Sequence, residues 1–229
     1  MISVSFFLHP SRQENLHAIN EQYKKIDLID EVLVITGTEV DTTFCHSKFK
    51  FIYLPGPYTY GQWPFTGLLG RYIFAQMAKN KYIFLQDDDC LFQETSLKKL
   101  LEFKLPLVGT KSTPRWFYDN KYQAIPPIKN TEMADIIITR GLLVDTNFMP
   151  KVLEYAKQFW ISEYNKVFNG EDIFLSRAVS KITKIDKFPF IDDEFIELPV
   201  HNVALDRKIN KKGSRTKICK EIYEFFDKM

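Results

Sequence analysis

Cysteine is scarce in this chain of 229 residues, and Cys45, Cys90 and Cys219 lie far apart. None belongs to a C-x-x-C pair, so the sequence contains neither a zinc-finger motif nor a thioredoxin-type redox motif. An odd number of widely spaced cysteines favours free thiols and a reducing compartment. We therefore expect a cytoplasmic protein.

The sequence also lacks a long hydrophobic run and a strong net charge. No apolar stretch approaches the roughly 20 residues that a transmembrane helix needs, so we expect no integral membrane segment. Residues 1–8 carry no basic leader and stop at His9-Pro10, which favours a first strand over a signal peptide. The 31 Lys and Arg nearly balance the 29 Asp and Glu, leaving a net charge of +2, so nothing indicates nucleic acid as a partner.

Several motifs of well-known enzyme classes are missing as well. The chain has only nine glycines and no Gly-rich phosphate loop, and neither G-x-S-x-G nor H-E-x-x-H occurs. These absences argue against P-loop nucleotide hydrolases, α/β-hydrolases and zinc proteases. We find no internal repeat and no low-complexity tract.

Strand-like runs and helical spacings alternate along the chain. The expected strands are residues 2–8, 32–36, 49–54, 82–86, 107–110 and 135–144. The expected helices are residues 12–25, 66–78, 97–103, 148–160, 171–179 and 218–226. This alternation predicts an α/β fold with a mostly parallel central sheet flanked by helices.

Two stretches depart from that alternation. Residues 112–127 are expected to form a long loop, in which Trp116 either provides a platform for a sugar acceptor or covers a sheet edge. Arg140-Gly141 falls near the middle of the expected strand 135–144. A glycine there indicates a bulge or the close approach of a ligand.

Three consecutive carboxylates follow the most strand-like stretch of the chain. Residues 82–86 predict a strand buried on both faces, and Asp87, Asp88 and Asp89 come directly after it. Neighbouring carboxylates repel one another unless a cation is present. Mg²⁺ or Mn²⁺ fits, because hard cations take oxygen ligands and share them with substrate phosphates at the carboxyl ends of strands. The alternative is a solvated acidic turn.

Arg71 lies off the apolar stripe of the expected helix 66–78, which leads into this strand. A guanidinium group binds phosphate through two parallel hydrogen bonds, so Arg71 is a candidate for contact with the anionic part of a ligand. The alternatives are a surface arginine or an ion pair with one of the three aspartates.

Glu171 and Asp172 stand at the expected start of the helix 171–179, with Asn169 or Gly170 as its cap. Acidic residues in the first turn complement the helix dipole, which explains them structurally. The functional alternative is that one of the two carboxylates faces a catalytic site.

The C-terminal part of the chain is basic. A cationic segment suits a diphosphate, although charge runs are more often merely solvated. Its basic residues are Arg207, Lys208, Lys211, Lys212, Arg215 and Lys217. His201 stands alone just before this segment. A lone histidine is usually a packed or surface residue, and the alternative is a metal ligand; we include His201 among the candidate metal ligands.

Together these features resemble the GT-A glycosyltransferases, and their order resembles the catalytic domain of the exostosin and exostosin-like family. That family has an Arg-aromatic helix leading into a hydrophobic strand that ends in Asp-Asp-Asp, as do Arg71-Tyr72 and residues 82–89. Its later acidic pair before an apolar helix is matched by Glu171-Asp172-Ile173. Its basic segment before a last helix is matched by residues 211–214. The resemblance covers nearly the whole chain, in short motifs.

The resemblance implies a single GT-A catalytic domain spanning residues 1–229. Residues 1–110 would form the nucleotide-sugar-binding half, and residues 111–229 the acceptor-binding half. The implied activity is that of a metal-dependent hexosyl- or N-acetylhexosaminyltransferase. Such an enzyme moves a sugar from a UDP-sugar to a glycan or another hydroxyl acceptor.

The resemblance also implies a role for each carboxylate of the triplet. Asp89 would bind Mn²⁺ (or Mg²⁺) directly, as the last residue of a DXD motif. Asp87 and Asp88 would contact the ribose of the nucleotide or a metal-bound water, and Asp87 is also among the candidate metal ligands.

The remaining candidates would act on the sugar and the diphosphate. By the same resemblance, Arg71 would contact the nucleotide sugar, and Lys212 or Arg215 would hold the diphosphate. Asp172 would lie beside the anomeric carbon, with Glu171 next to it. Asp172 would either stabilise an oxocarbenium-like sugar or, in an inverting enzyme, deprotonate the acceptor. The resemblance favours retention.

The sequence departs from the family in two respects. Family members are tethered to membranes and carry a disulfide, whereas this chain begins at its first expected strand and shows no such cysteine pairing. An Asn-rich stretch that precedes the family's arginine is replaced by residues 66–70, Thr-Gly-Leu-Leu-Gly, so the contacts that this stretch makes in the family are not carried over.

Two rival functions fit the same acidic strand end. A nucleotidyltransferase acting on sugar phosphates also places carboxylates at strand ends, but it normally uses two metals and a Gly-rich phosphate loop. The other rival is a non-catalytic module that binds a nucleotide or a carbohydrate.

Overall fold

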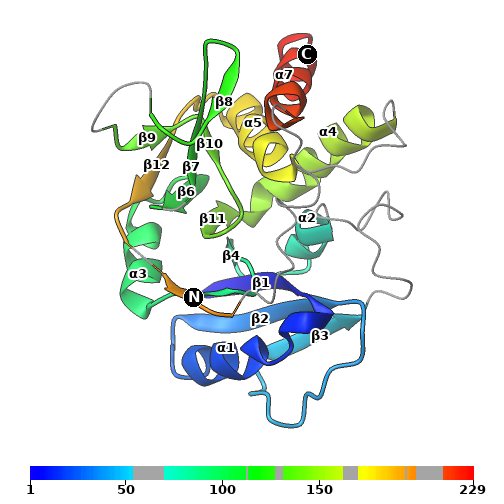
Figure 1. The fold of residues 1–229 in the computed structure, drawn as a ribbon, viewed down its shortest axis with the longest axis vertical. Helices are drawn as coiled ribbons and strands as arrows, with labels where there is room; N and C mark the ends of the chain where they lie inside the picture. Colours follow the sequence, from blue (N-terminus) through cyan, green and yellow to red (C-terminus); the bar gives the residue numbers. More distant parts are fainter. Residues whose placement is uncertain (54–69, 112, 127–130, 162–169, 194, 200–213) are drawn as a thin grey trace.

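A computed structural model of the chain describes residues 1–53, 70–111, 113–126, 131–161, 170–193, 195–199 and 214–229 (Figure 1). Its main feature is an eight-stranded sheet in the order β3-β2-β1-β4-β11-β6-β12-β9. The strands of this sheet are β1 (Ile2–Leu8), β2 (Ile29–Thr36), β3 (Phe49–Tyr53), β4 (Tyr82–Leu85), β6 (Leu107–Thr110), β9 (Met133–Ala134), β11 (Leu142–Asp145) and β12 (Phe188–Ile191).

The sheet is mixed but mostly parallel. Strands β1, β2, β3 and β4 run parallel to their neighbours in this group, and β12 runs parallel to β6. Strand β11 is antiparallel to both β4 and β6, and β9 is antiparallel to β12. The α/β fold predicted from the sequence is therefore confirmed.

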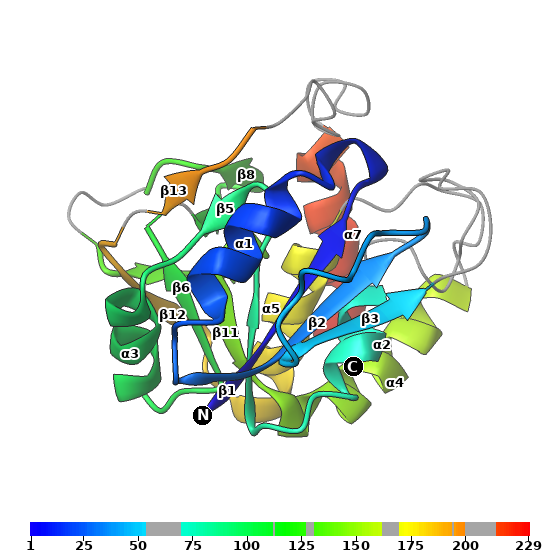
Figure 2. The same ribbon diagram turned by 90° about the horizontal axis from the view of Figure 1, so that it is seen from below.

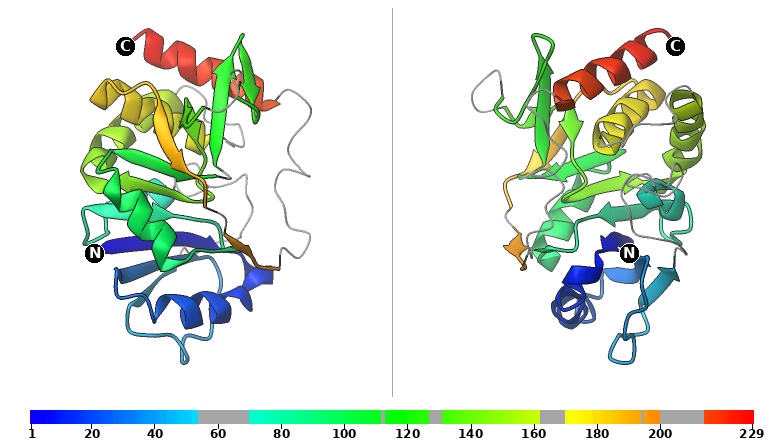
Figure 3. Two further views of the ribbon diagram at one scale, coloured as in Figure 1. Left: turned by 90° about the vertical axis from the view of Figure 1, so that its left-hand side faces the viewer. Right: turned by 45° about the vertical axis from the view of Figure 1, so that its right-hand side comes forward.

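Helices cover both faces of this sheet (Figure 3). They are α1 (Asn15–Tyr23), α2 (Gly70–Ala75), α3 (Glu94–Glu102), α4 (Met149–Ile161), α5 (Glu171–Thr183) and α7 (Ser214–Asp227), with short 3₁₀ helices η1 (Pro10–Arg12) and η2 (Thr146–Phe148). Apolar side chains of α1 and α3 share one hydrophobic core, and those of α2, α4, α5 and α7 share the other.

The alternation of side chains along each strand divides the residues between these two cores. In β4, Phe84 belongs to the core beneath α1 and α3, while Ile83 and Leu85 belong to the opposite core. All three are fully buried, as expected for a strand in the middle of a sheet that is covered on both faces.

The prediction of one long loop at residues 112–127 is wrong. The described part of this stretch contains an antiparallel hairpin of β7 (Pro114–Tyr118) and β8 (Lys121–Gln123). Asp119 and Asn120 form its turn with φ of 50° and 57°, a left-handed conformation that these two residue types tolerate well. The turn chemistry was visible in the sequence, but the flanking strands lack a clear apolar alternation.

Trp116 of this hairpin covers a sheet edge and is not a platform for an acceptor. Only 4% of the residue is exposed. Its indole N–H donates to the backbone carbonyl of Met133 in the edge strand β9 at 3.0 Å, and its ring meets Phe190 of β12 edge to face. Of the two alternatives drawn from the sequence, the structural one holds.

The expected strand at residues 135–144 is divided in two. Strand β10 (Ile136–Ile137) pairs with β7, and β11 joins the main sheet, with a turn at Arg140-Gly141 between them. Gly141 is a site of close approach, as predicted, but to protein atoms. A Cβ there would lie 2.7 Å from Cζ of Phe92 and 2.7 Å from Oγ1 of Thr110.

A short two-stranded ribbon of β5 (Cys90–Leu91) and β13 (Ile196–Glu197) leads away from the end of β4 and passes near the start of α1 (Figure 2). Through this pairing, the residues that directly follow the Asp triplet are held in a regular strand. All three cysteines are free thiols, and Cys90 and Cys219 are buried. None of the described helices is both long and apolar enough to cross a bilayer.

Candidate functional site

The carboxyl ends of β1 and β4 lie side by side, because the two strands pair in parallel from Ser3 opposite Ile83 to Ser5 opposite Leu85. The segment that follows β1 therefore meets the Asp triplet that follows β4. This is the edge at which open α/β sheets bind their ligands. The site begins with this contact.

Asp88 is the most enclosed carboxylate of the triplet, with 3% of the residue exposed. Oδ1 accepts a hydrogen bond from Nη1 of Arg12 at 2.5 Å, and Oδ2 accepts one from the backbone N–H of His9 at 2.7 Å. Burial raises the pKa of Asp88 to about 6, although the charge of Arg12 opposes that rise. Both oxygens of Asp88 thus have protein partners.

Asp89 and Asp87 lie on either side of this anchored residue. Oδ2 of Asp89 is 3.3 Å from Nη1 of Arg12, and Oδ1 accepts a weak hydrogen bond from Sγ of Cys90 at 3.2 Å. The backbone carbonyl of Asp89 accepts a hydrogen bond from the N–H of Leu198, which ties the triplet to the segment after β13. The side chain of Asp87 is 32% exposed, the largest exposure among the three.

Arg71 connects the triplet to the turn that contains Thr139. Its Nη2 is 2.7 Å from Oδ1 of Asp87, and its Nη1 donates to the hydroxyl of Thr139 at 2.8 Å. Burial lowers the pKa of the guanidinium, but the charges of Asp87 and Glu171 outweigh it and hold the pKa above its usual value. The ion pair with an aspartate was one of the alternatives left open by the sequence, and it is the arrangement found.

Glu171 and Asp172 form the first turn of α5, and both are buried. Gly170 is the N-cap residue and makes no side-chain capping bond. Oδ1 of Asp172 accepts from the N–H of Ile173 at 2.8 Å, and its Oδ2 lies 3.3 Å from Nη1 of Arg215. Asp172 therefore holds the helix start and, at the same time, an arginine from α7.

Glu171 has fewer hydrogen-bond partners than Asp172. Its Oε2 is buried and has no hydrogen-bond partner. Burial, and after it the charge of Asp172, raises the pKa of Glu171 to about 8, although Arg71 and Arg215 oppose the rise. A buried polar atom without a partner costs free energy, and such atoms concentrate at functional sites.

Further unpartnered atoms lie in the same region. Nε of Arg71 and the hydroxyl of Tyr72 are buried and make no hydrogen bond. Burial raises the pKa of Tyr72 well above its usual value, and the charges of Glu171 and Asp172 raise it further. Glu171 at the start of α5 and Arg71 and Tyr72 of α2 therefore carry buried polar atoms with unused hydrogen-bonding capacity.

Arg215 also contacts the hairpin. Its Nη1 donates to the hydroxyl of Tyr122 at 3.0 Å, and its guanidinium lies 5.6 Å from the centre of that ring. Lys212 and His201, the other candidates from the C-terminal part, lie outside the described residues. The structure thus brings seven of the nine predicted site residues to one edge of the sheet: Arg71, Asp87, Asp88, Asp89, Glu171, Asp172 and Arg215.

Three partners in this site were missed by the sequence reasoning. Arg12 lies in a short 3₁₀ helix without periodicity, Thr139 in a turn, and Tyr122 in a strand that was expected to be loop. The only signal for Arg12 was a charged residue four positions after the buried strand β1.

The carboxylate oxygens of the triplet are chemically suited to bind a hard divalent cation. Among the described residues, no group of three or more His, Cys, Asp or Glu side chains is arranged to hold a metal ion. Mg²⁺ and Mn²⁺ sites of nucleotide-dependent enzymes nevertheless use one or two carboxylates and complete their coordination with phosphates and water. Asp87 and Asp89 supply such a pair, while both oxygens of Asp88 are already bonded to Arg12 and His9.

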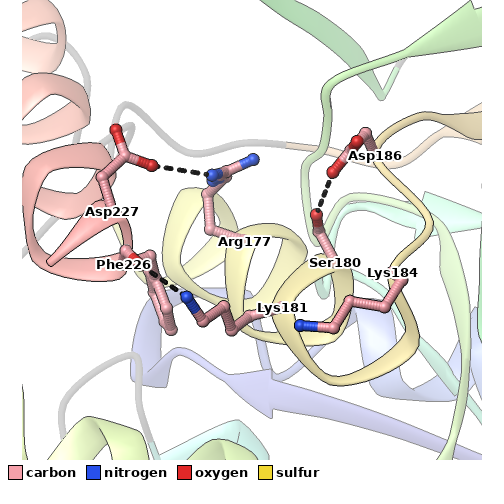
Figure 4. A pocket seen from close by; sticks show the side chains of 7 residues that line it. All are labelled: Arg177, Ser180, Lys181, Lys184, Asp186, Phe226 and Asp227. Atoms are coloured by element: carbon pink, nitrogen blue, oxygen red, sulfur yellow. Dashed lines mark hydrogen bonds and ion pairs between the residues drawn. The ribbon is translucent and has the colours of Figure 1, made fainter. Parts of the chain in front are cut away.

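An open cavity of about 480 Å³ lies elsewhere, between the end of α5 and α7 (Figure 4). Two of the three cations that line it have partners: Arg177 is 3.5 Å from Asp227, and Nζ of Lys181 donates to the carbonyl of Phe226 at 3.0 Å. Cations near the last turn of a helix also complement its dipole. This surface is therefore explained by helix packing.

Comparison with solved structures supports the fold. The chain is similar to 4-diphosphocytidyl-2C-methyl-D-erythritol synthase from Anaerococcus prevotii DSM 20548, with a TM-score of 0.55 and 14% identity over 88% of this chain and 91% of that one. TarS (1–349) of S. aureus gives a TM-score of 0.49 and 12% identity, over 86% of this chain and 60% of TarS.

Sequence comparison adds no family to this result. No protein-family model matches the chain, and no curated protein matches it either. The mixed α/β sheet flanked by helices matches GT-A-like structures, as predicted. Neither of the two similar structures points to the exostosin family in particular.

Proposed function

We propose that this protein is a metal-dependent glycosyltransferase that moves a sugar from a nucleotide sugar, UDP-sugar in the first instance, to a hydroxyl acceptor. One observation carries the proposal. The buried Arg71 connects two acidic groups: its Nη2 is 2.7 Å from Oδ1 of Asp87 in the triplet, and Glu171 at the start of α5 is close enough to influence the pKa of the guanidinium. Such a site can meet a diphosphate at one end and a sugar at the other.

The diphosphate end would be formed by the triplet and arginines. Asp87 and Asp89 would hold Mn²⁺ or Mg²⁺, which would neutralise the charge that develops on the departing diphosphate. Arg71 would contribute a fixed positive charge on the same side. It already faces Asp87, so a phosphate oxygen would replace or share that carboxylate as its partner.

The sugar end would be formed by the start of α5. A buried Asp172 supplies a negative charge that would stabilise an oxocarbenium-like sugar, or would accept a proton from the acceptor hydroxyl. Arg215 keeps this carboxylate in place from α7. The resemblance to the exostosin family, which is the narrower form of the proposal, favours the first role and retention of configuration.

The organisation of the chain follows from the same proposal. Residues 1–110 would contribute most of the nucleotide-sugar-binding half and residues 111–229 the acceptor-binding half, although β11, β12 and β9 of the second range join the common sheet. Glycan acceptors, and hexose or N-acetylhexosamine as the transferred sugar, are the substrates that we would test first. Lys212 and His201 stay candidates for the diphosphate and the metal.

A nucleotidyltransferase is the second candidate, and the similarity to the Anaerococcus synthase favours it. The segment after β1 argues against it. Phosphate loops need glycine so that backbone N–H groups can approach the phosphates closely, whereas residues 9–14 are His-Pro-Ser-Arg-Gln-Glu and include the buried Arg12. A nucleotidyltransferase would release pyrophosphate, and a glycosyltransferase would release UDP. A non-catalytic binding module would release neither.

The test uses a panel of nucleotide sugars with and without Mn²⁺. We expect one UDP-sugar to raise the melting temperature only when Mn²⁺ is present, because a ligand that binds the folded state stabilises it. Incubation with that donor and candidate acceptors should release UDP. Pyrophosphate release from a nucleoside triphosphate and a sugar phosphate would instead establish the second candidate.

Asp172→Asn separates catalysis from binding. We expect this variant to bind the donor as the wild type does and to lose transfer. Asp192→Asn is the matched control, because Asp192 is an exposed aspartate whose side chain is 82% accessible and pairs only with the surface residue Lys111 among the described contacts. Unimpaired turnover of Asp172→Asn would remove this residue from the mechanism.

A further inference from the structure

We infer that Arg12 and Asp88 form a buried ion pair whose task is to position Asp87 and Asp89, and that Asp88 itself touches neither metal nor nucleotide. The inference refines the proposed function and rests on it for the identity of the ligand. It also assigns a role to Arg12, which no motif in the sequence had indicated.

The hydrogen bonds of Asp88 support this assignment. One carboxylate oxygen accepts from Nη1 of Arg12 and the other from the N–H of His9, while its backbone carbonyl accepts from Nδ2 of Asn15 at 2.9 Å. These three donors belong to the residue directly after β1, to η1 and to the first residue of α1. The middle of the triplet is thus fixed at three points to one continuous stretch of chain.

Exposure separates Asp88 from its neighbours in the same way. Its side chain is 4% exposed, against 32% for Asp87 and 10% for Asp89. A ligand atom could reach Asp88 only by displacing a guanidinium group that is itself buried. Removing one partner from a buried ion pair leaves an uncompensated charge, so displacement is strongly unfavourable.

Arg12 also acts on Asp89 directly, since its Nη1 lies 3.3 Å from Oδ2 of that residue. One guanidinium therefore compensates two adjacent carboxylates that would otherwise repel each other and turn apart. A ligand-binding pair of carboxylates needs its orientation fixed by surrounding hydrogen bonds. Arg12 and Asp88 supply that support for the carboxylates of Asp87 and Asp89.

A double-mutant cycle tests whether the pair acts as a unit. The variants are Arg12→Met, which keeps length and loses charge, Asp88→Asn, and the two combined. We expect each single variant to lower the urea midpoint of unfolding. In the combined variant, Asp88→Asn should lower it no further, because the charge that it removes has already lost its partner. If the combined variant instead loses the sum of the two single losses in stability, Arg12 and Asp88 do not act as a unit and the inference is wrong.

Binding of Mn²⁺ and UDP by calorimetry tests positioning. Arg12→Met should weaken the affinity at least tenfold, and Arg12→Lys, which restores the charge, should recover part of the loss. Asp88→Asn should weaken binding in the wild type but change it less than twofold in the Arg12→Met background. An equal loss in both backgrounds would show that Asp88 contacts the ligand itself, and the inference would be wrong.

Hydrogen exchange gives a readout that needs no ligand. Arg12→Met should speed exchange of the amides of His9 and of residues 87–90. The matched control is Arg177→Met, which removes another arginine that pairs with an aspartate but lies at the cavity between α5 and α7. It should leave these amides and the affinity for Mn²⁺ and UDP unchanged. Unchanged exchange in Arg12→Met would refute positioning.

The proposed function and the positioning role of Arg12 and Asp88 can be refuted separately. If the wild type binds no nucleotide with Mn²⁺, the proposed function is wrong, while the stability cycle and the exchange data still decide whether Arg12 and Asp88 hold the triplet in place. If the wild type binds and Arg12→Met binds equally well, only the positioning role is wrong.

Discussion

Replacing Glu171 by glutamine tests whether this buried carboxyl group is neutral in the folded protein. The residue is 4% exposed, and its Oε2 has no hydrogen-bond partner. Burial and the adjacent charge of Asp172 raise its pKa from 4.5 to about 8. Glutamine has the same shape as the protonated side chain, so Glu171→Gln should resemble the wild type wherever Glu171 is protonated.

The sign of the pH dependence follows from proton binding. Between pH 4.5 and about 8 the folded protein holds the Glu171 proton while the unfolded chain has lost it. The contribution of this group to the free energy of unfolding is therefore fully present below pH 4.5, falls as the pH rises, and stays lost above pH 8. One pKa unit corresponds to about 1.4 kcal/mol, so the shift sets an upper limit of about 5 kcal/mol. Relaxation and water entry lower the measured loss to a few kcal/mol.

Urea unfolding of the metal-free protein from pH 5 to pH 9 measures this effect. The wild type should lose stability across the range, and Glu171→Gln should lose distinctly less, so that the variant is the more stable protein at pH 9. Glu224→Gln, which changes an exposed glutamate on α7, should follow the wild-type curve. Parallel curves for Glu171→Gln and the wild type would refute the assignment of a buried neutral carboxyl.

Three further outcomes test other parts of the structure. Arg71→Met should weaken nucleotide affinity at least tenfold and destabilise the fold by about 3 kcal/mol, because Asp87 loses its buried partner; calorimetry and urea unfolding measure both, and unchanged affinity would remove Arg71 from the site. Gly141→Ala should lower stability by about 1–3 kcal/mol, since the new Cβ meets Phe92 and Thr110 at 2.7 Å; an unchanged melting temperature would contradict this close approach. Chelation of divalent cations should abolish the thermal stabilisation by UDP, and persistence of that shift would argue against metal-dependent binding.

The sequence predicted those parts of the fold that local pattern controls. Strands β1 and β6 have the expected bounds, Ile2–Leu8 and Leu107–Thr110, because each is an apolar run closed by a turn signal. The position of the triplet at the end of β4 followed from the same pattern. Arg71 at the site followed from its place on the helix before that strand, although its partner stayed open.

Other parts depend on contacts that no local pattern records. Strands β9, β10 and β13 have two residues each and exist because a neighbouring strand offers hydrogen-bonding partners. The turn at Gly141 that divides residues 135–144 is set by Phe92 and Thr110 from other elements. Periodicity cannot predict these features, since the residues involved are distant in the chain.

The role of Arg12 shows the same limit within the site. The resemblance gave Asp87 and Asp88 the same contacts, with the ribose or a metal-bound water, and Asp87 was in addition a candidate metal ligand; adjacent aspartates look alike in a motif. Only the parallel pairing of β1 with β4 brings the segment after β1 to the triplet, and it gives Asp88 a buried partner that Asp87 does not share.

Charge compensation connects the separate parts of this site. Each of three carboxylates contacts an arginine from a different element: the pairs are Arg12–Asp88, Arg71–Asp87 and Arg215–Asp172. The first pair is enclosed, whereas Asp87 and Arg215 are partly exposed, at 32% and 23% of their side chains. An entering diphosphate can therefore compete for the exposed pairs and leave the enclosed one intact. A metal bound by Asp87 would in turn release Arg71 toward the phosphates, so that cation and nucleotide are expected to bind cooperatively.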